Sequence, residues 1–157
     1  YDAYSSISLE GILEEIKHES SLDDPKATKV NFIVLRKKDE SPIGVASIRN
    51  INRQNGNAEI VLGIGDKGKR LAGYGVDMMI VLLDIVFYQL GFEKAYMVAH
   101  ENNKLGLNSA LNFGFQAEGR LRKHSFIEGN YVDLWVLGLL KEEYEKLPII
   151  PKWKARK

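Results

Sequence analysis

The longest apolar run in the chain covers residues 76–90 and is interrupted by polar side chains at Asp77, Asp84 and Tyr88. Their spacings of seven and four residues place them on one stripe of a helix, so the run predicts a helix with a narrow polar face. Residues 57–65 are predicted to form a strand, and a glycine-rich loop separates the two. The pattern therefore predicts a strand, a loop and a buried helix in that order.

The flanking segments predict further elements of both kinds. Ser8 is expected to cap a helix with apolar residues at positions 9, 12, 13 and 16, and a polar loop containing Pro25 follows. Strands are expected at 31–36, 43–50, 93–100, 121–127 and 132–140, and helices at 103–113 and 141–147. The pair Asn55-Gly56 and the triplet Glu128-Gly129-Asn130 mark hairpin turns.

Length and charge restrict the function classes. The 157 residues suffice for one domain, which we place at residues 1–147, followed by a basic tail at 148–157. The net charge of +1 gives no reason to expect nucleic acid or a membrane as partner. The apolar run at 76–90 is shorter than the roughly 20 residues that span a bilayer, and no signal peptide is expected at the start.

The chain has no cysteine and three scattered histidines. The absence of cysteine excludes disulfides, thiol catalysis and thiolate metal sites, and it suits a cytoplasmic protein. The isolated histidines argue against zinc, so no metal is expected.

The loop Arg70-Leu71-Ala72-Gly73-Tyr74-Gly75 has the chemistry of a phosphate cradle. Gly73 and Gly75 lack a Cβ atom and let a ligand approach the backbone. The first-turn amides of the following helix have no partner within the helix and favour negative charge. Arg70 adds a cation at the edge of this loop.

Two separated motifs resemble those of the GNAT acetyltransferases. The first is Ala58-Glu59-Ile60 followed by Arg70-x-x-Gly73-x-Gly75, which is similar to the family's acyl-CoA-binding core. The second is Asn103, then Phe113-Gly114-Phe115 and Glu118-Gly119, and the hairpin at 128–133 is also shared. The likeness extends over roughly residues 8–144. It is strongest to the branch of ribosomal-protein N-terminal and spermidine acetyltransferases.

This resemblance implies a fold and a reaction. The expected fold is α+β, with a mixed, mostly antiparallel sheet of about six to seven strands whose middle strands splay apart, flanked by helices. The expected reaction moves the acetyl group of acetyl-CoA, without a metal, to a small-molecule amine, a polyamine or a peptide N-terminus by direct attack in a ternary complex. A homodimer is among the assemblies that the resemblance implies.

The resemblance also implies roles for particular residues. Backbone groups of Leu62, Gly63 and Ile64 would hold the thioester, and the pyrophosphate would bind to Arg70, Leu71, Ala72, Gly73, Tyr74, Gly75 and Val76. Asn103 would cap its helix and contact the pantetheine arm. Because an alkylamine has a pKa of about 10.4, a general base is useful, and Glu59 is the first candidate and His100 the second.

Three departures from the family pattern weaken the catalytic interpretation. The helix tyrosine that often protonates the leaving thiolate is replaced by Ala110, and Ser109 is the substitute donor we consider first, with Tyr74 or water as others. The motif's alanine is replaced by Gly106. The family's first strand and helix are expected to be missing or short.

Three other functions compete with acetyl transfer, and nucleic-acid binding through the basic tail at 148–157 is the least favoured of them. A non-catalytic acyl-CoA-binding module would need the glycine loop but no acid or base. Nucleotide hydrolysis is suggested by Gly63-x-x-x-x-Gly68-Lys69-Arg70, which is nearly a P-loop. Its last position requires a hydroxyl for magnesium, which Arg70 lacks, and we expect antiparallel hairpins rather than a parallel βαβ unit around it.

Overall fold

The computed structural model describes residues 21–36, 38–64 and 74–150. The elements are β1 (Lys29–Leu35), β2 (Pro42–Asn52), β3 (Asn57–Ile64), α2 (Tyr74–Asp84), the π-helical turn η2 (Ile85–Gln89), β4 (Lys94–His100), α3 (Lys104–Phe113), β5 (Gln116–Ile127), β6 (Asn130–Leu140) and α4 (Lys141–Glu145). Every strand and helix predicted between residues 21 and 150 is confirmed. The helix predicted from Ser8 and most of the predicted tail lie outside the described residues.

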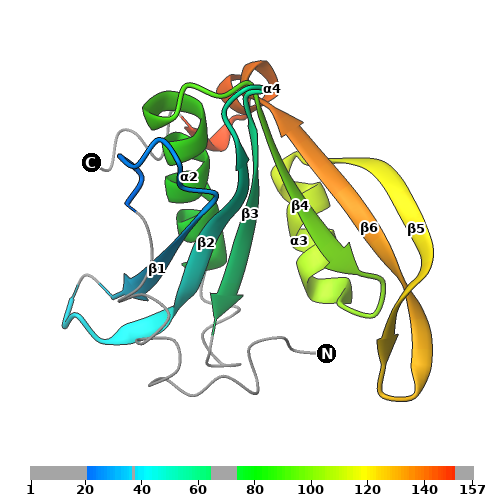
Figure 1. The fold of residues 1–157 in the computed structure, drawn as a ribbon. Helices are drawn as coiled ribbons and strands as arrows, with labels where there is room; N and C mark the ends of the chain where they lie inside the picture. The colour runs from blue at the N-terminus through cyan, green and yellow to red at the C-terminus, as the bar shows by residue number, and fades with distance from the viewer. Residues whose placement is uncertain (1–20, 37, 65–73, 151–157) are drawn as a thin grey trace.

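The strands form one sheet of six, in the order β1-β2-β3-β4-β6-β5 (Figure 1). Every neighbouring pair is antiparallel except β3 and β4, which run parallel. The sheet is therefore mixed and mostly antiparallel, as expected, and helices pack against it to give an α+β fold.

The connection from β3 to β4 contradicts the expectation that the glycine loop is not part of a parallel βαβ unit. The chain leaves β3 at Ile64, returns through α2 and η2, and enters β4 beside β3 in the same direction. Parallel neighbours need such a crossover, because a short turn can only reverse the chain. The glycine loop thus lies in a βαβ unit, and the argument against nucleotide hydrolysis rests on Arg70 alone.

Local sequence explains the hairpin between β2 and β3. Gly56 adopts a φ of +61°, in the left-handed region that glycine enters without strain. The side chain of Asn52 accepts a hydrogen bond from the backbone N–H of Asn55 at 2.9 Å. The Asn-Gly pair therefore forms the predicted turn, and it fixes the register in which Ile48 lies opposite Ile60.

Helix α2 supplies the centre of the core. Its side chains at Met78, Met79, Ile80, Leu82 and Leu83 are all buried. Full burial of such side chains is worth about 1.5–3 kcal/mol each, so this helix contributes a large share of the folding free energy. The core extends to Ile150, which is 3% exposed and lies three positions beyond the predicted end of the domain.

The register of the strands defines two faces of the sheet. Ile60, Ala58, Ala95 and Leu139 belong to the buried core that α2 and α3 cover. Because side chains alternate along a strand, the intervening residues point to the opposite face. That second face carries Glu59, Tyr96 and, farther along β4, His100.

Candidate functional site

The parallel pair β3 and β4 separates along its length. Only residues 57–59 of β3 pair with residues 94–96 of β4, and the ladder ends at Glu59 and Tyr96. Beyond these residues β3 continues to Ile64 and β4 to His100, each pairing with its outer neighbour, and the two strands diverge (Figure 1). The predicted splay of the middle strands is confirmed. It leaves the edges of both strands facing each other without a shared ladder.

The predicted thioester-holding residues lie on this diverging part of β3. Leu62, Gly63 and Ile64 pair with β2 on one side, and their other side borders the splay. Tyr74 and Gly75 begin α2, so its first-turn amides lie just after the loop that follows β3. Arg70, Leu71, Ala72 and Gly73 lie outside the described residues.

Glu59 lies at the apex of the splay and is 4% exposed. Its Oε1 accepts a hydrogen bond from Arg49 Nη2 at 2.9 Å, and its Oε2 accepts one from Asn50 Nδ2 at 2.7 Å. Both carboxylate oxygens are therefore engaged by donors from β2. Each oxygen can still accept a further hydrogen bond, but the two existing bonds and the burial of Glu59 hold its carboxylate against β2.

His100 lies at the open end of the splay. Counting four residues onward from the pair Glu59 and Tyr96 brings Gly63 and His100 to the same level, about 13 Å along the strands from the apex. His100 Nε2 is 3.0 Å from Ser125 Oγ, and partial burial, aided by the nearby His124, lowers the pKa of His100 below its usual 6.5. The lowered pKa favours the neutral imidazole.

Helix α3 borders the β4 side of the splay. Asn103 caps it as predicted, because its side chain accepts a hydrogen bond from Gly106 N at 3.1 Å. A Cβ atom on Gly106 would lie 2.6 Å from Asn103 Nδ2, so an alanine there would require the Asn103 side chain to shift. Ser109 is exposed, whereas Ala110, at the position of the family tyrosine, is fully buried in the core.

An irregularity in β5 brings charged residues to the same end of the sheet. Asp133 on β6 accepts hydrogen bonds from Lys123 N at 2.7 Å and Arg120 Nε at 2.6 Å. Arg120 also pairs with Glu101 at 3.2 Å and lies over the Trp135 ring. These donors hold the pKa of Asp133 below its usual value. Asp133 is therefore already engaged by donors from β5.

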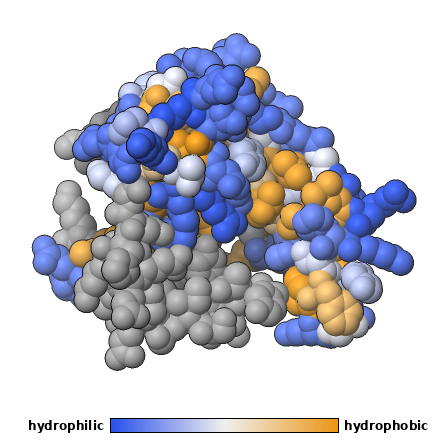
Figure 2. All heavy atoms as spheres, viewed as in Figure 1, coloured by the Kyte–Doolittle hydropathy of each residue, from blue (hydrophilic) through white to orange (hydrophobic). Residues whose placement is uncertain are grey.

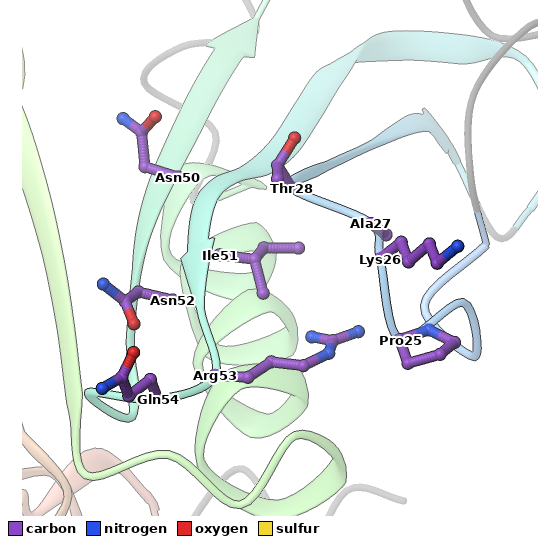
Figure 3. Close-up of a pocket in the computed structure, with 9 residues that line it drawn as sticks. All are labelled: Pro25, Lys26, Ala27, Thr28, Asn50, Ile51, Asn52, Arg53 and Gln54. Carbon is purple, nitrogen blue, oxygen red and sulfur yellow. The ribbon is translucent and has the colours of Figure 1, made fainter.

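A separate hollow of about 420 Å³ lies between residues 25–28 and residues 50–54 (Figure 3). Arg53 crosses this region, and its Nη2 donates to the carbonyl oxygens of Leu22 at 3.3 Å and Asp24 at 2.8 Å. The backbone N–H of Ile51 also bonds the carbonyl of Thr28 at 3.1 Å. These contacts fasten the segment before β1 to the end of β2, so the hollow has a structural origin apart from the splay.

Within residues 21–36, 38–64 and 74–150, no three histidine, aspartate or glutamate side chains are grouped closely enough to hold a metal ion. Among the described helices, none has the length and apolar character needed to cross a bilayer.

Two curated N-acetyltransferases are similar to this chain in sequence. The chain is 28% identical over 109 residues to the SPbeta prophage-derived uncharacterized N-acetyltransferase YokL of Bacillus subtilis, covering 68% of this chain and 60% of that protein. It is 29% identical over 115 residues to the uncharacterized N-acetyltransferase p20 of Bacillus licheniformis, covering 72% and 63%. The chain thus spans less than two thirds of the length of these curated relatives.

Solved structures share the fold. A variant of the spermidine N-acetyltransferase SpeG from Vibrio cholerae superposes with a TM-score of 0.73 at 24% identity, covering 88% of this chain and 76% of that one. Residues 4–116 match the acetyltransferase (GNAT) domain family, and this range contains the splay, α2 and α3. The chain therefore belongs to the GNAT acetyltransferase family.

Proposed function

We propose that the protein transfers the acetyl group of acetyl-CoA to an amine. The observation that carries the proposal is the splay of β3 and β4 immediately before the N-terminus of α2. The unshared strand edge offers backbone groups to an extended pantetheine arm, and the first-turn amides of α2 offer donors to phosphates. The family match and the curated N-acetyltransferase relatives support the same reaction.

Acetyl-CoA would supply an activated thioester, and the residues of this chain would position it. Leu62, Gly63 and Ile64 would orient the thioester through backbone N–H and C=O groups at the splay. Tyr74, Gly75 and Val76, together with the preceding loop, would bind the pyrophosphate. Asn103 already serves as a cap, and its exposed position allows contact with the pantetheine arm as well.

We assign the general base to His100 in preference to Glu59. His100 lies level with Gly63 across the splay, whereas Glu59 lies at the apex with both oxygens engaged. If Nε2–H of His100 donates to Ser125 Oγ, then Nδ1 keeps its lone pair and can accept the proton of the attacking amine. As nitrogen bonds to the carbonyl carbon, the carbon–sulfur bond breaks and the thiolate leaves.

The leaving thiolate needs little protein assistance. A thiol has a pKa near 8.5, so its conjugate base is a tolerable leaving group without an acid. Ser109 is exposed on α3 and remains our candidate donor, with water as the alternative. The buried Ala110 offers no hydroxyl.

A panel of acceptors tests the proposal. Release of free CoA from acetyl-CoA would be followed with a polyamine, an aminoglycoside and N-terminal peptides, in the presence of a chelator. Acceptor-dependent release at well above the hydrolysis rate is expected, with the acetylated amine identified by mass spectrometry. Binding of acetyl-CoA with no turnover of any acceptor would instead favour a non-catalytic acyl-CoA-binding module, for which Ala110 is the supporting observation.

A further inference from the structure

The exposed edge of the sheet carries an unusual bulge next to His100. β5 pairs with β6 at Leu121 opposite Leu134 and again at Ser125 opposite Val132. Four steps along β5 thus match two along β6, which leaves two extra residues in β5. Residues 122–124, with the sequence Arg-Lys-His, are displaced from the ladder, as bulged residues are.

Side-chain contacts hold the bulge in a defined conformation. Lys123 has a φ of +51°, an uncommon conformation for a residue with a side chain. Asp133 accepts its backbone N–H at 2.7 Å and the Arg120 guanidinium at 2.6 Å, and thereby secures both sides of the bulge. Bulges recur beside active sites, where they redirect side chains.

Positive charge is in excess at this place. Three cationic side chains (Arg120, Arg122 and Lys123) face two carboxylates (Glu101 and Asp133), and Arg120 is paired with both carboxylates. Among the described residues, Arg122 and Lys123 form no ion pair within 4 Å and both are exposed, although the charge of Arg122 also acts on Asp133 and helps to lower its pKa. Residues 120–124 line a groove of about 680 Å³. Figure 2 shows hydrophilic residues projecting from the β5–β6 side of the molecule at the right, above an orange patch. Phe126 and Tyr131, next to the turn between the two strands, are exposed.

This groove is within reach of a substrate at His100. The imidazole is 3.0 Å from Ser125 Oγ, and Ser125 lies two residues from Lys123. Two Cα–Cα steps of about 3.8 Å, added to this contact and to the Ser125 side chain, place the backbone of Lys123 within roughly 13 Å of the imidazole. A group at the third position of an extended peptide lies at a similar distance from the N-terminal amine.

We propose that Arg122 and Lys123 bind an anionic group of the acceptor within roughly 13 Å of its reactive amine, so that the enzyme prefers acidic acceptors to polycations. The inference rests on the proposed function, in which the amine meets His100. Three cations and two carboxylates leave a local excess of one positive charge, so a carboxylate held there is attracted and a second ammonium group is repelled. The bulge therefore acts as a specificity element, separate from the acetyl-CoA site.

Three tripeptide amides test this preference, because they share a free N-terminus and differ only at the third residue, which is Glu, Gln or Lys. The kcat/KM for CoA release is expected to be highest for Glu and lowest for Lys, with about a tenfold span at low salt. The span should shrink at 0.5 M salt, where charges are screened within a few ångströms. Equal values, or a preference for Lys, would overturn the inference while leaving acetyl transfer intact.

A charge-reversed variant locates the effect. Arg122→Glu combined with Lys123→Glu is expected to reverse the order of the Glu and Lys peptides and to leave the Gln peptide nearly unchanged. The matched control is Lys38→Glu combined with Lys146→Glu, which changes the net charge equally at exposed residues outside β5 and β6. A control that alters the preference as much as the bulge variant would show a general charge effect and refute the site.

Binding provides a second measurement that does not depend on turnover. Fluorescently labelled Glu and Lys peptides would be titrated with the parent and the bulge variant, and anisotropy would report affinity. If no amine is acetylated, the proposed function fails, yet tighter binding of the Glu peptide to the parent alone would still support the groove. Equal affinities of the two peptides for the parent would contradict it.

Discussion

His100 and Glu59 share one face of the sheet, but their surroundings suit them to different tasks. Glu59 is buried and bonded through both oxygens to Arg49 and Asn50, which suits a residue that fastens β2 to the apex of the splay. Among the described residues, His100 forms a side-chain hydrogen bond with Ser125 alone, and it lies where the strands are far apart. Its second ring nitrogen has no partner in this part of the chain, whereas both oxygens of Glu59 already accept a hydrogen bond.

His100→Gln is expected to lower kcat/KM by about 10²-fold or more near neutral pH, the usual contribution of a general base. Burial lowers the pKa of His100 below 6.5, so the neutral imidazole persists below that pH. The acid limb of the parent's pH–rate profile should therefore fall below pH 6.5, and it should be absent in the variant. An acid limb retained unchanged in the variant would exclude His100, provided that acetyl-CoA affinity is unaltered.

Glu59→Gln separates the two roles. If Glu59 fastens the apex, the variant should lose about 1–3 kcal/mol of stability to urea, since a charged hydrogen bond to Arg49 is weakened, and kcat should fall by less than about tenfold. A loss of kcat of about 10²-fold that shrinks as pH rises would instead identify Glu59 as the base. The exposed Asn50 can turn its amide to suit the new side chain.

At the scale of elements, α2 and η2 show how a polar stripe is built into a buried helix. The predicted stripe of Asp77, Asp84 and Tyr88 exists, but the helix changes to a π-helical turn at Ile85. Asp84 Oδ1 accepts a hydrogen bond at 2.8 Å from the hydroxyl of Tyr144, which is fully buried on α4. The last predicted helix is thus fastened to the central one by a polar contact inside the core.

Tyr144→Phe removes this contact and is expected to reduce the free energy of unfolding by about 1–3 kcal/mol, the cost of a hydrogen bond lost at a partly buried charge. Tyr88→Phe is the matched control. Its hydroxyl bonds Glu145 at 3.2 Å near the surface, and its loss should cost less than about 0.5 kcal/mol. Urea unfolding measures both values, and equal losses would show that the buried Tyr144 hydroxyl contributes no more than the surface hydroxyl of Tyr88.

Strands, turns and caps could be predicted because their signals are local. Asn55-Gly56 specifies a turn, Asn103 specifies a cap, and Gly114 follows α3 at a φ of +133°. The bulge at residues 122–124 could not be predicted, because it depends on Asp133 in the neighbouring strand. The π-helical turn and the parallel return of β4 likewise depend on tertiary packing. The one local hint at the bulge was its uninterrupted run of basic residues.

At the scale of the whole molecule, the sheet consists of two halves joined over three residue pairs. One half contains β1, β2 and β3 with α2, and the other contains β4, β6 and β5 with α3 (Figure 1). The short junction creates the splay, and the resemblance to GNAT proteins predicted it from motifs that lie on both halves. The acceptor end could not be predicted, since His100, Ser125 and the bulge come together only through the pairing of β4, β6 and β5.

We propose that acetyl-CoA binds in the splay. Amide hydrogen exchange, measured in a chelator with and without acetyl-CoA, tests this binding site. The unshared edge of β3 at residues 61–64 and the first turn of α2 should exchange at least about tenfold more slowly when the ligand is bound, because its groups would cover these amides. The β1–β2 ladder, which lies away from the splay, serves as the internal reference and should change less than about twofold. Protection confined to the hollow at residues 25–28 and 50–54, or no change at the splay at saturating acetyl-CoA, would contradict the account.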